Sequence, residues 1–150
     1  MSNVLHISEA ASLALHATTY LAGCSGRSVT SREIARTLKV SHAHLSKVLQ
    51  RLQRAGIVNS SRGPQGGFSL ARSADRVTLL QVYEAIEGRL RLDRCLFDRP
   101  VCNGENCLLG SLLVKFNQEI KEHLQNTRLS ALRNTYGDGS YARREKSRED

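Results

Sequence analysis

The sequence contains no tryptophan and only three phenylalanines and four tyrosines in 150 residues. So few aromatic rings argue against a single-strand nucleic-acid binder that stacks bases on its side chains. No apolar run of about 18 residues is present, which argues against a membrane-spanning helix. Because the N-terminal segment has no basic stretch followed by an unbroken apolar run, we expect no secretory signal and a cytoplasmic location.

Cysteine is scarce too, and without a secretory signal the four thiols do not indicate a disulfide framework. Thiols in a reducing compartment are more typical of metal, redox or catalytic use. A cysteine nucleophile needs a base placed beside it. No cysteine here lies in a recognisable nucleophile motif with a histidine and an orienting acid, so we expect that the protein is not an enzyme.

Acidic residues are nearly absent between Cys24 and Arg76, where ten lysines and arginines accompany only two acids. The rest of the chain holds twelve basic and twelve acidic residues, so the whole net charge of +8 lies in this segment. Such segregation is typical of a surface that faces a polyanion, because neutralised phosphates release counterions. Duplex DNA is the expected partner, and a merely solvated basic face is the alternative.

Helical periodicity within that segment predicts a helix-turn-helix between residues 31 and 50. A first helix is expected from Ser8 to about Ala22. Thr30 is expected to cap a second helix, with Glu33 returning a bond in a capping box. Ser41 is the expected cap of a third helix that runs to about Ala55.

A two-stranded hairpin is expected directly after the helix pair. Ile57 and Val58 begin one strand, the segment 68–70 returns, and the glycine-rich sequence 62–67 between them is typical of a turn. A fourth helix is expected from Thr78 to Gly88. The fold class is therefore mainly α: a winged helix-turn-helix with a two-stranded wing, in a DNA-binding domain over 1–88.

The exposed side and N-terminal end of the third helix enter the major groove in this architecture. Arg62 has the size and charge to enter a minor groove, and the neighbouring glycines allow close approach to phosphates. The alternative for Arg62 is an ordinary surface arginine. The alternative for His42 and His44 is a surface position without a role in DNA binding. The expected DNA-binding residues are Thr30, Ser41, His42, His44, Lys47, Arg51, Arg62, Gly63 and Gln65.

The C-terminal third is expected to hold a cysteine-bearing loop over 89–107, a dimerisation helix over 108–133 and a disordered tail over 134–150. The helix carries a long apolar stripe. Its members are Leu108, Leu109, Leu112, Leu113, Phe116, Ile120 and Leu124. A domain this small cannot bury such a stripe alone, so a homodimer is expected, which Leu113→Glu or Phe116→Glu should disrupt.

Three cysteines, Cys95, Cys102 and Cys107, lie within thirteen residues of this loop, and Arg94 and Arg99 lie beside them. Thiolate sulfur favours zinc, copper(I) or an iron–sulfur cluster, and nearby arginines offset thiolate charge. The spacing is not that of a zinc ribbon. The alternatives are a structural zinc with three cysteines and a histidine, unligated redox-sensing thiols, and a cluster-free regulator that senses a metabolite through a partner protein. Cys24 is interpreted as structural.

The string VSHAHLSKVLQRLQRAGIVNSSRGPQGGFSLARSADRVTLLQVYEAIEG resembles the winged-helix transcription regulators of the Rrf family. The resemblance spans about Leu5 to Asn126. It implies a homodimer, with a long C-terminal helix crossing to the partner, that binds a palindromic operator in duplex DNA. Cluster-bearing members place three cysteines just before or at the start of that helix, so an iron–sulfur cluster is the favoured cofactor. Repression is expected, because a small dimer acts most simply by occupying a promoter.

Three cysteines leave a cluster one protein ligand short, and the resemblance implies several sources for the fourth. Family members that use a histidine shortly after the third cysteine would need it at Gly110, and those that use a first-helix aspartate would need it at Ser12. Relatives with a first-helix histidine one turn further on correspond to His16, from the partner subunit. A histidine ligand favours a 2Fe-2S over a 4Fe-4S cluster. Glu9 is the second candidate, and a packed or capping role for His16 is the alternative.

Overall fold

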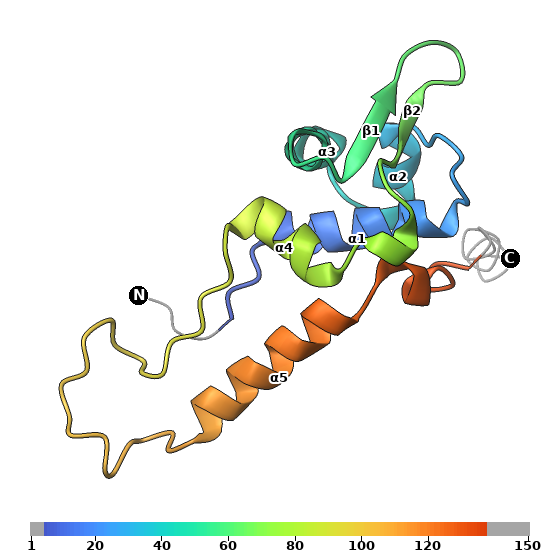
Figure 1. Cartoon of the computed structure of the whole chain (residues 1–150). Helices are drawn as coiled ribbons and strands as arrows, with labels where there is room; N and C mark the ends of the chain where they lie inside the picture. The colour runs from blue at the N-terminus through green and yellow to red at the C-terminus, as the bar shows by residue number, and fades with distance from the viewer. Residues whose placement is uncertain (1–4, 138–150) are drawn as a thin grey trace, which may run out of the picture.

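The computed structural model describes residues 5–137 (Figure 1), and the part of the predicted tail over 138–150 lies outside them. The fold is mainly helical with a two-stranded antiparallel wing, as the sequence predicts. In chain order its elements are α1 (Glu9–Gly23), α2 (Ser31–Leu38), α3 (His42–Arg54), β1 (Val58–Ser61), β2 (Gly67–Leu70), the 3-10 turn η1 (Ala74–Arg76), α4 (Leu79–Glu87), α5 (Leu112–Asn126) and the 3-10 turn η2 (Leu129–Leu132).

The predicted starts of the first four helices are confirmed by hydrogen bonds from the backbone to a capping side chain. These caps are Ser8, Thr30, Ser41 and Thr78. At the start of α4 the bond is reciprocal, because the Gln81 side chain also accepts from the Thr78 N–H. Each cap satisfies a backbone donor that the first turn of a helix leaves unpaired.

The reciprocal capping box predicted at Thr30 is wrong in one half. Thr30 accepts from the Glu33 N–H, but the Glu33 carboxylate turns away and accepts from Arg27 at 2.8 Å and from the Tyr20 hydroxyl at 3.1 Å. The guanidinium carries a full positive charge and can donate two bonds to the carboxylate, whereas a backbone N–H is neutral and donates one. The bond from Arg27 keeps the pKa of Glu33 below its usual value.

Helix α1 lies at the centre of the core, in contact with α2, α3 and α4. Its inner face is built from small side chains, and Ala11, Ala14 and Ala17 are fully buried. Small residues let neighbouring helices approach closely. Larger side chains from the surrounding elements fill the space left between them, namely Ile34, Leu45, Leu49, Leu52, Val58 and Val82.

The wing is attached to the helices by a pairing that sequence analysis missed. β1 and β2 pair in antiparallel register from Val58 opposite Leu70 to Ser61 opposite Gly67. Val29, just before α2, forms a bridge with Phe68, with N–O distances of 2.8 and 2.7 Å in the two directions. A Cβ on Gly67 would lie 2.5 Å from the Val29 carbonyl oxygen, so glycine is required for this close approach.

The helix predicted over 108–133 is shorter than expected at both ends. It begins at Leu112, after Gly110 in the left-handed conformation, and ends at Asn126. Thr127 then accepts from the Leu79 N–H at 3.0 Å, and Leu129 donates to the Val77 carbonyl at 2.9 Å. Leu129 is fully buried. Burial of this side chain and pairing with the start of α4 therefore end the helix.

The disordered tail is also predicted to begin too early, because residues 134–137 are described and packed. The Tyr136 ring lies edge-on to Tyr20 with centroids 5.8 Å apart, and its centroid is 6.4 Å from that of His16. These aromatic contacts, which join the end of the described chain to α1, had no signal in the local sequence.

Candidate nucleic-acid interface and cysteine loop

The turn between α2 and α3 presents the N-terminal end of α3 to solvent. Lys39 adopts the left-handed conformation, with φ 55°, and its N–H donates to the end of α2. The cap Ser41 and the following His42 are exposed, and so is Lys47 on the next turn. This helix end therefore offers polar side chains and a positive backbone dipole to an anionic partner.

The two histidines of α3 are both held by other helices. His42 Nε2 lies 2.8 Å from the Ser31 hydroxyl at the start of α2. His44 Nδ1 lies 3.5 Å from the Glu9 carboxylate at the start of α1. These contacts orient both rings, and they also give Glu9 a partner within its own chain.

Arg51 faces α4 rather than the N-terminal end of α3. Its guanidinium donates to the carbonyl of Ile86 in the last turn of α4. A cation is favourable there because the last carbonyls of a helix lack partners within the helix. The contact joins α3 to α4, a connection that no sequence pattern indicates.

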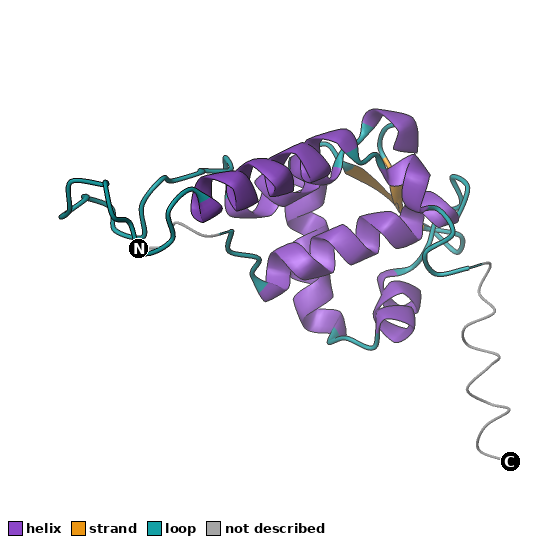
Figure 2. Cartoon of the chain, turned by 90° about the horizontal axis from the view of Figure 1, so that it is seen from below, coloured by secondary structure: helices purple, strands orange, loops and turns teal. Residues whose placement is uncertain are grey.

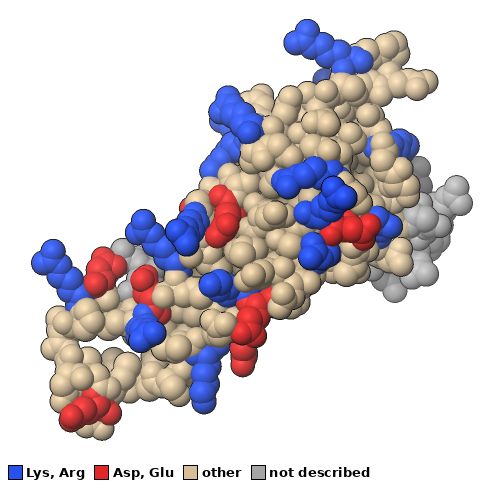
Figure 3. All heavy atoms as spheres, in the orientation of Figure 1, with Lys and Arg blue, Asp and Glu red and all other residues tan. Residues whose placement is uncertain are grey.

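The wing tip is exposed at Arg62, Gly63 and Gln65. Gly63 has φ 106° and accepts from the Gly66 N–H at 2.9 Å, which closes the turn. Figure 1 shows the wing projecting away from the helices. In Figure 3 the end of the molecule with the wing and α3 shows basic side chains without acidic neighbours, whereas both signs mix over α4 and the loop.

The cysteine loop extends away from the helical body in both Figure 1 and Figure 2. Cys95 is half-buried, whereas Cys102 and Cys107 are exposed. The loop is attached at its start, because the buried Asn117 of α5 donates to the carbonyl of Asp93 at 3.0 Å. Within residues 5–137, no three histidine, cysteine or acidic side chains converge as a metal site would require.

His16 is exposed on α1, where its Nδ1 lies 2.7 Å from the Ser12 carbonyl and its ring faces Tyr136. This chain by itself therefore places His16 in no metal-holding group with the described cysteines. The fourth thiol, Cys24, is half-buried, and burial raises its pKa. That environment favours the neutral thiol, in agreement with a structural role.

The apolar stripe of the C-terminal region divides between two environments. Leu113 and Leu124 are buried against their own chain, together with Asn117. Other large apolar side chains of the loop and α5 face solvent, namely Leu96, Phe97, Val101, Leu108, Leu112, Val114 and Phe116. Exposed apolar surface of this extent is typical of an interaction site.

Comparison with known proteins identifies the family to which this fold belongs. The sequence profile of Rrf2, described as an iron-dependent transcriptional regulator, matches residues 7–135. The chain belongs to the Rrf2 family. A helix-turn-helix transcriptional regulator of Aquifex aeolicus is 31% identical over 130 residues, which are 85% of this chain and 90% of the relative.

Two solved structures show the same architecture as this Rrf2 protein. CymR of B. subtilis, named as its global cysteine regulator, matches with TM-score 0.73 and 28% identity over 90% of this chain and 100% of its own. IscR of T. potens matches with TM-score 0.65 and 26% identity over 87% and 88%. The chain is thus a DNA-binding transcriptional regulator with a winged helix, and not an enzyme.

None of the helices in the described part of this Rrf2 chain has the length and apolar character needed to cross a bilayer.

The sequence did not predict the contacts made by Val29, Asn117 and the Ile86 carbonyl. Each of these contacts is a backbone pairing or a single hydrogen bond to a distant residue. Val29 carried a weak signal, as a β-branched residue between Gly26 and the cap of α2.

Proposed function

We propose that this regulator is a homodimeric repressor that binds a palindromic operator, with the N-terminal end of α3 in the major groove and the wing tip in the minor groove. The observation that carries the proposal is the joint exposure of these two features within the one segment that holds the whole net charge. The proposed contact residues are Thr30, Ser41, His42, His44, Lys47, Arg62, Gly63 and Gln65, with Arg51 positioning α3 from behind.

Phosphate contacts would supply most of the affinity, and base contacts the specificity. Ser41 and the first N–H groups of α3 are suited to a phosphate, because the helix N-terminus carries partial positive charge. His42 and Lys47 are exposed on the same helix and can reach base edges. Arg62 at the wing tip suits the narrow, negative minor groove.

We further propose that Cys95, Cys102 and Cys107 hold an iron–sulfur cluster, a 2Fe-2S cluster in preference to 4Fe-4S, with His16 of the partner subunit as fourth ligand. Three thiols on one loop form a soft donor set that fits such a cluster. The family description as iron-dependent supports this assignment. When bound, the cluster supplies a centre whose redox state or loss responds to oxidants, nitric oxide or cluster supply.

The contacts around the loop provide a route from the cysteines to the DNA-binding helix. Glu84 of α4 accepts from the N–H of Leu90 at the start of the loop, at 2.9 Å. Ile86, half a turn further along α4, accepts from Arg51 of α3. A change in the loop conformation that alters the end of α4 would therefore alter the position of α3. It would thereby shift the equilibrium between a state that binds DNA tightly and one that binds it weakly.

The experiment is anaerobic purification followed by ultraviolet–visible spectroscopy, iron and sulfide analysis, and titration of selected operator DNA. Wild-type protein should show a sulfur-to-iron absorption band. Cys95→Ala, Cys102→Ala and Cys107→Ala should each lose the band and change DNA affinity in the direction of chemical cluster loss. Cys24→Ala is the control that should retain both properties.

His16→Ala tests the fourth ligand separately. We expect a shifted absorption band or reduction potential with an unchanged oligomeric state. An unaltered spectrum, potential and DNA affinity would place the fourth ligand elsewhere, with Glu9, Ser12 or a small exogenous molecule as the remaining choices. DNA binding that is identical in all three loop-cysteine variants under every redox condition would refute the sensor model.

A thiol-based regulator without a cluster is the second candidate function. It is favoured by the exposure of Cys102 and Cys107 on a loop without helix or strand, and by the fold likeness to CymR. The same spectrum separates the candidates. Colourless protein without metal supports the thiol regulator, whereas colourless protein with one zinc per chain supports a zinc-stabilised form.

A further inference from the structure

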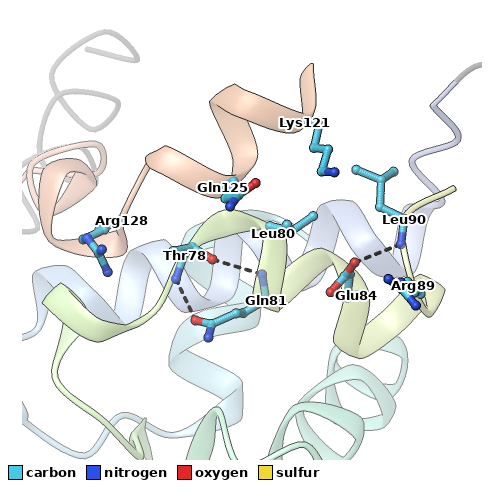
Figure 4. A pocket seen from close by; sticks show the side chains of 9 residues that line it. All are labelled: Thr78, Leu80, Gln81, Glu84, Arg89, Leu90, Lys121, Gln125 and Arg128. Carbon is cyan, nitrogen blue, oxygen red and sulfur yellow. Dashed lines mark hydrogen bonds between the residues drawn. The ribbon is translucent and has the colours of Figure 1, made fainter. Parts of the chain in front are cut away.

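A groove of about 610 Å³ runs between α4 and α5, on elements outside the proposed DNA-contact surface (Figure 4). Its walls come from α4, the first residues of the cysteine loop, α5 and the segment after α5. The lining residues that could contact a ligand are Leu80, Arg89, Leu90, Lys121, Gln125 and Arg128. None of these residues is among the proposed DNA contacts or the proposed cluster ligands.

The charge in this groove is predominantly positive. Arg89, Lys121 and Arg128 contribute three cations, and Glu84 is the single carboxylate among the lining residues. Arg128 also donates from Nη1 to the Asp75 carbonyl at 3.0 Å, so a ligand would pair with its other N–H groups. That carboxylate already accepts from the Leu90 N–H. Three cations around one concave site, with one partly satisfied acid, favour an anionic ligand with more than one negative charge.

The cations lie at opposite ends of the groove. In Figure 4, Arg128 lies at one end and Lys121 and Arg89 at the other, with Leu80 and Gln125 between them. Leu80 and Leu90 are half-buried and give the floor an apolar part. Since the Gln81 side chain is engaged in capping α4, the Gln125 amide is the polar group available in the middle.

We propose that this groove binds a small dicarboxylate. One carboxylate pairs with Arg128, the other with Lys121 and Arg89, and the carbon chain between them covers Leu80. A ligand in this place bridges α4, the start of the cysteine loop and the end of α5. The site is therefore a second input to the regulator, and it does not depend on the presence of a cluster.

Contacts of its lining residues and their neighbours connect the groove to the DNA-binding helix. Arg128 follows α5 and bridges to Thr78, the cap of α4. Arg89 and Leu90 directly follow the turn of α4 whose Ile86 carbonyl accepts from Arg51 of α3. A ligand that fixes α5 against α4 should therefore shift the equilibrium between the states of high and low operator affinity. The size of the shift is set by the ratio of the ligand's affinities for these two states.

Calorimetric titration of the full chain at physiological salt tests the proposal. The probes are succinate, adipate, inorganic phosphate and adipamide, the neutral diamide of adipate. We expect a dicarboxylate to bind and adipamide not to bind. Lys121→Ala should weaken binding about tenfold, the loss expected for one charge-assisted hydrogen bond. Lys115→Ala, on α5 but outside the groove, is the matched control.

Arg62→Ala distinguishes this site from the proposed DNA surface, because it should retain dicarboxylate binding while losing operator affinity. Circular dichroism confirms that each variant is folded. The proposal is overturned if adipamide binds as well as adipate, if Lys121→Ala binds like wild type, or if only inorganic phosphate binds. Absence of binding of either dicarboxylate up to about 10 mM overturns it too, since that concentration corresponds to negligible affinity.

Discussion

Arg51 and Arg62 have the same side chain and lie eleven residues apart in the basic segment, yet their surroundings differ. Arg51 donates to a helix C-terminus, whereas Arg62 is exposed at the tip of a hairpin. Charge count treats the two as equivalent. Their functions should separate, because the Arg51 guanidinium is held against the end of α4, whereas Arg62 extends from the exposed wing tip.

Arg62→Ala should weaken operator binding by about 1–3 kcal/mol if the side chain contacts a base edge or lies in the minor groove. Fluorescence anisotropy with operator DNA at several salt concentrations measures both affinity and salt slope. Lys115→Ala, which removes an exposed cation outside the basic segment, is the control and should leave both unchanged. An Arg62→Ala titration that overlays the wild type would refute the wing assignment.

The Glu33 carboxylate predicts a pH dependence of stability. Arg27 lowers its pKa in the folded state, so the pair stabilises the fold above the unfolded pKa and this stabilisation disappears as pH falls through the folded value. Because both side chains are substantially exposed, Glu33→Gln should cost less than about 1 kcal/mol at pH 7.

Urea denaturation at two pH values checks this expectation. The difference between wild type and Glu33→Gln should be present at pH 7 and should shrink once the pH falls below the unfolded pKa of about 4.3 towards the lower folded value. A difference of the same size at both pH values would show that the ion pair is not its source.

At the scale of elements, packing decided where α5 stops. Local sequence favours continuing the helix to Leu132, since no glycine or proline lies between Leu124 and that residue. Instead Arg128 bridges to Thr78, and Leu129 enters the core with no exposed surface. Burial of a leucine contributes about 1.5–3 kcal/mol, which favours the conformation in which Leu129 enters the core.

Leu129→Ala should therefore destabilise the fold by about 2–5 kcal/mol, because it removes buried methyl groups and leaves a cavity. Thermal and urea unfolding measure the loss. Leu132→Ala, at a half-buried position in the same 3-10 turn, should cost clearly less. Equal losses in the two variants would mean that Leu129 is not the residue that anchors the end of α5.

The exposed apolar side chains of the loop and α5 form the surface at which the proposed homodimer would assemble. Of the two substitutions expected to disrupt a dimer, Leu113→Glu and Phe116→Glu, the structure favours the second as the test. Leu113 is only 4% exposed, so Leu113→Glu would damage the core of its own chain. Phe116 is 45% exposed, and a charge there can disrupt an interface without affecting the fold.

Analytical ultracentrifugation should show a wild-type dimer at micromolar concentration and a folded monomer for Phe116→Glu. Gln118→Glu, a charge added at another exposed position of α5, is the control that should remain dimeric. A stable wild-type monomer would contradict the proposed homodimer and remove the physical basis for a palindromic operator.

Elements with local signals could be predicted from the amino-acid sequence. Four helix caps, the helix-turn-helix and the glycine-rich wing were predictable because capping side chains, helical periodicity and turn residues act within a few positions of one another. The concentration of positive charge between Cys24 and Arg76 was also evident from the sequence, because it requires only a count of charged residues. These features placed the exposed end of α3 and the wing tip correctly.

Other features depend on tertiary contacts, which join residues far apart in the chain. The Val29–Phe68 bridge, the Arg51–Ile86 contact and the pairing of Thr127 with Leu79 connect segments 35 to 48 residues apart. The groove between α4 and α5 depends on the last of these. A local pattern reports what a segment prefers alone, whereas burial and backbone pairing determine what it does when packed.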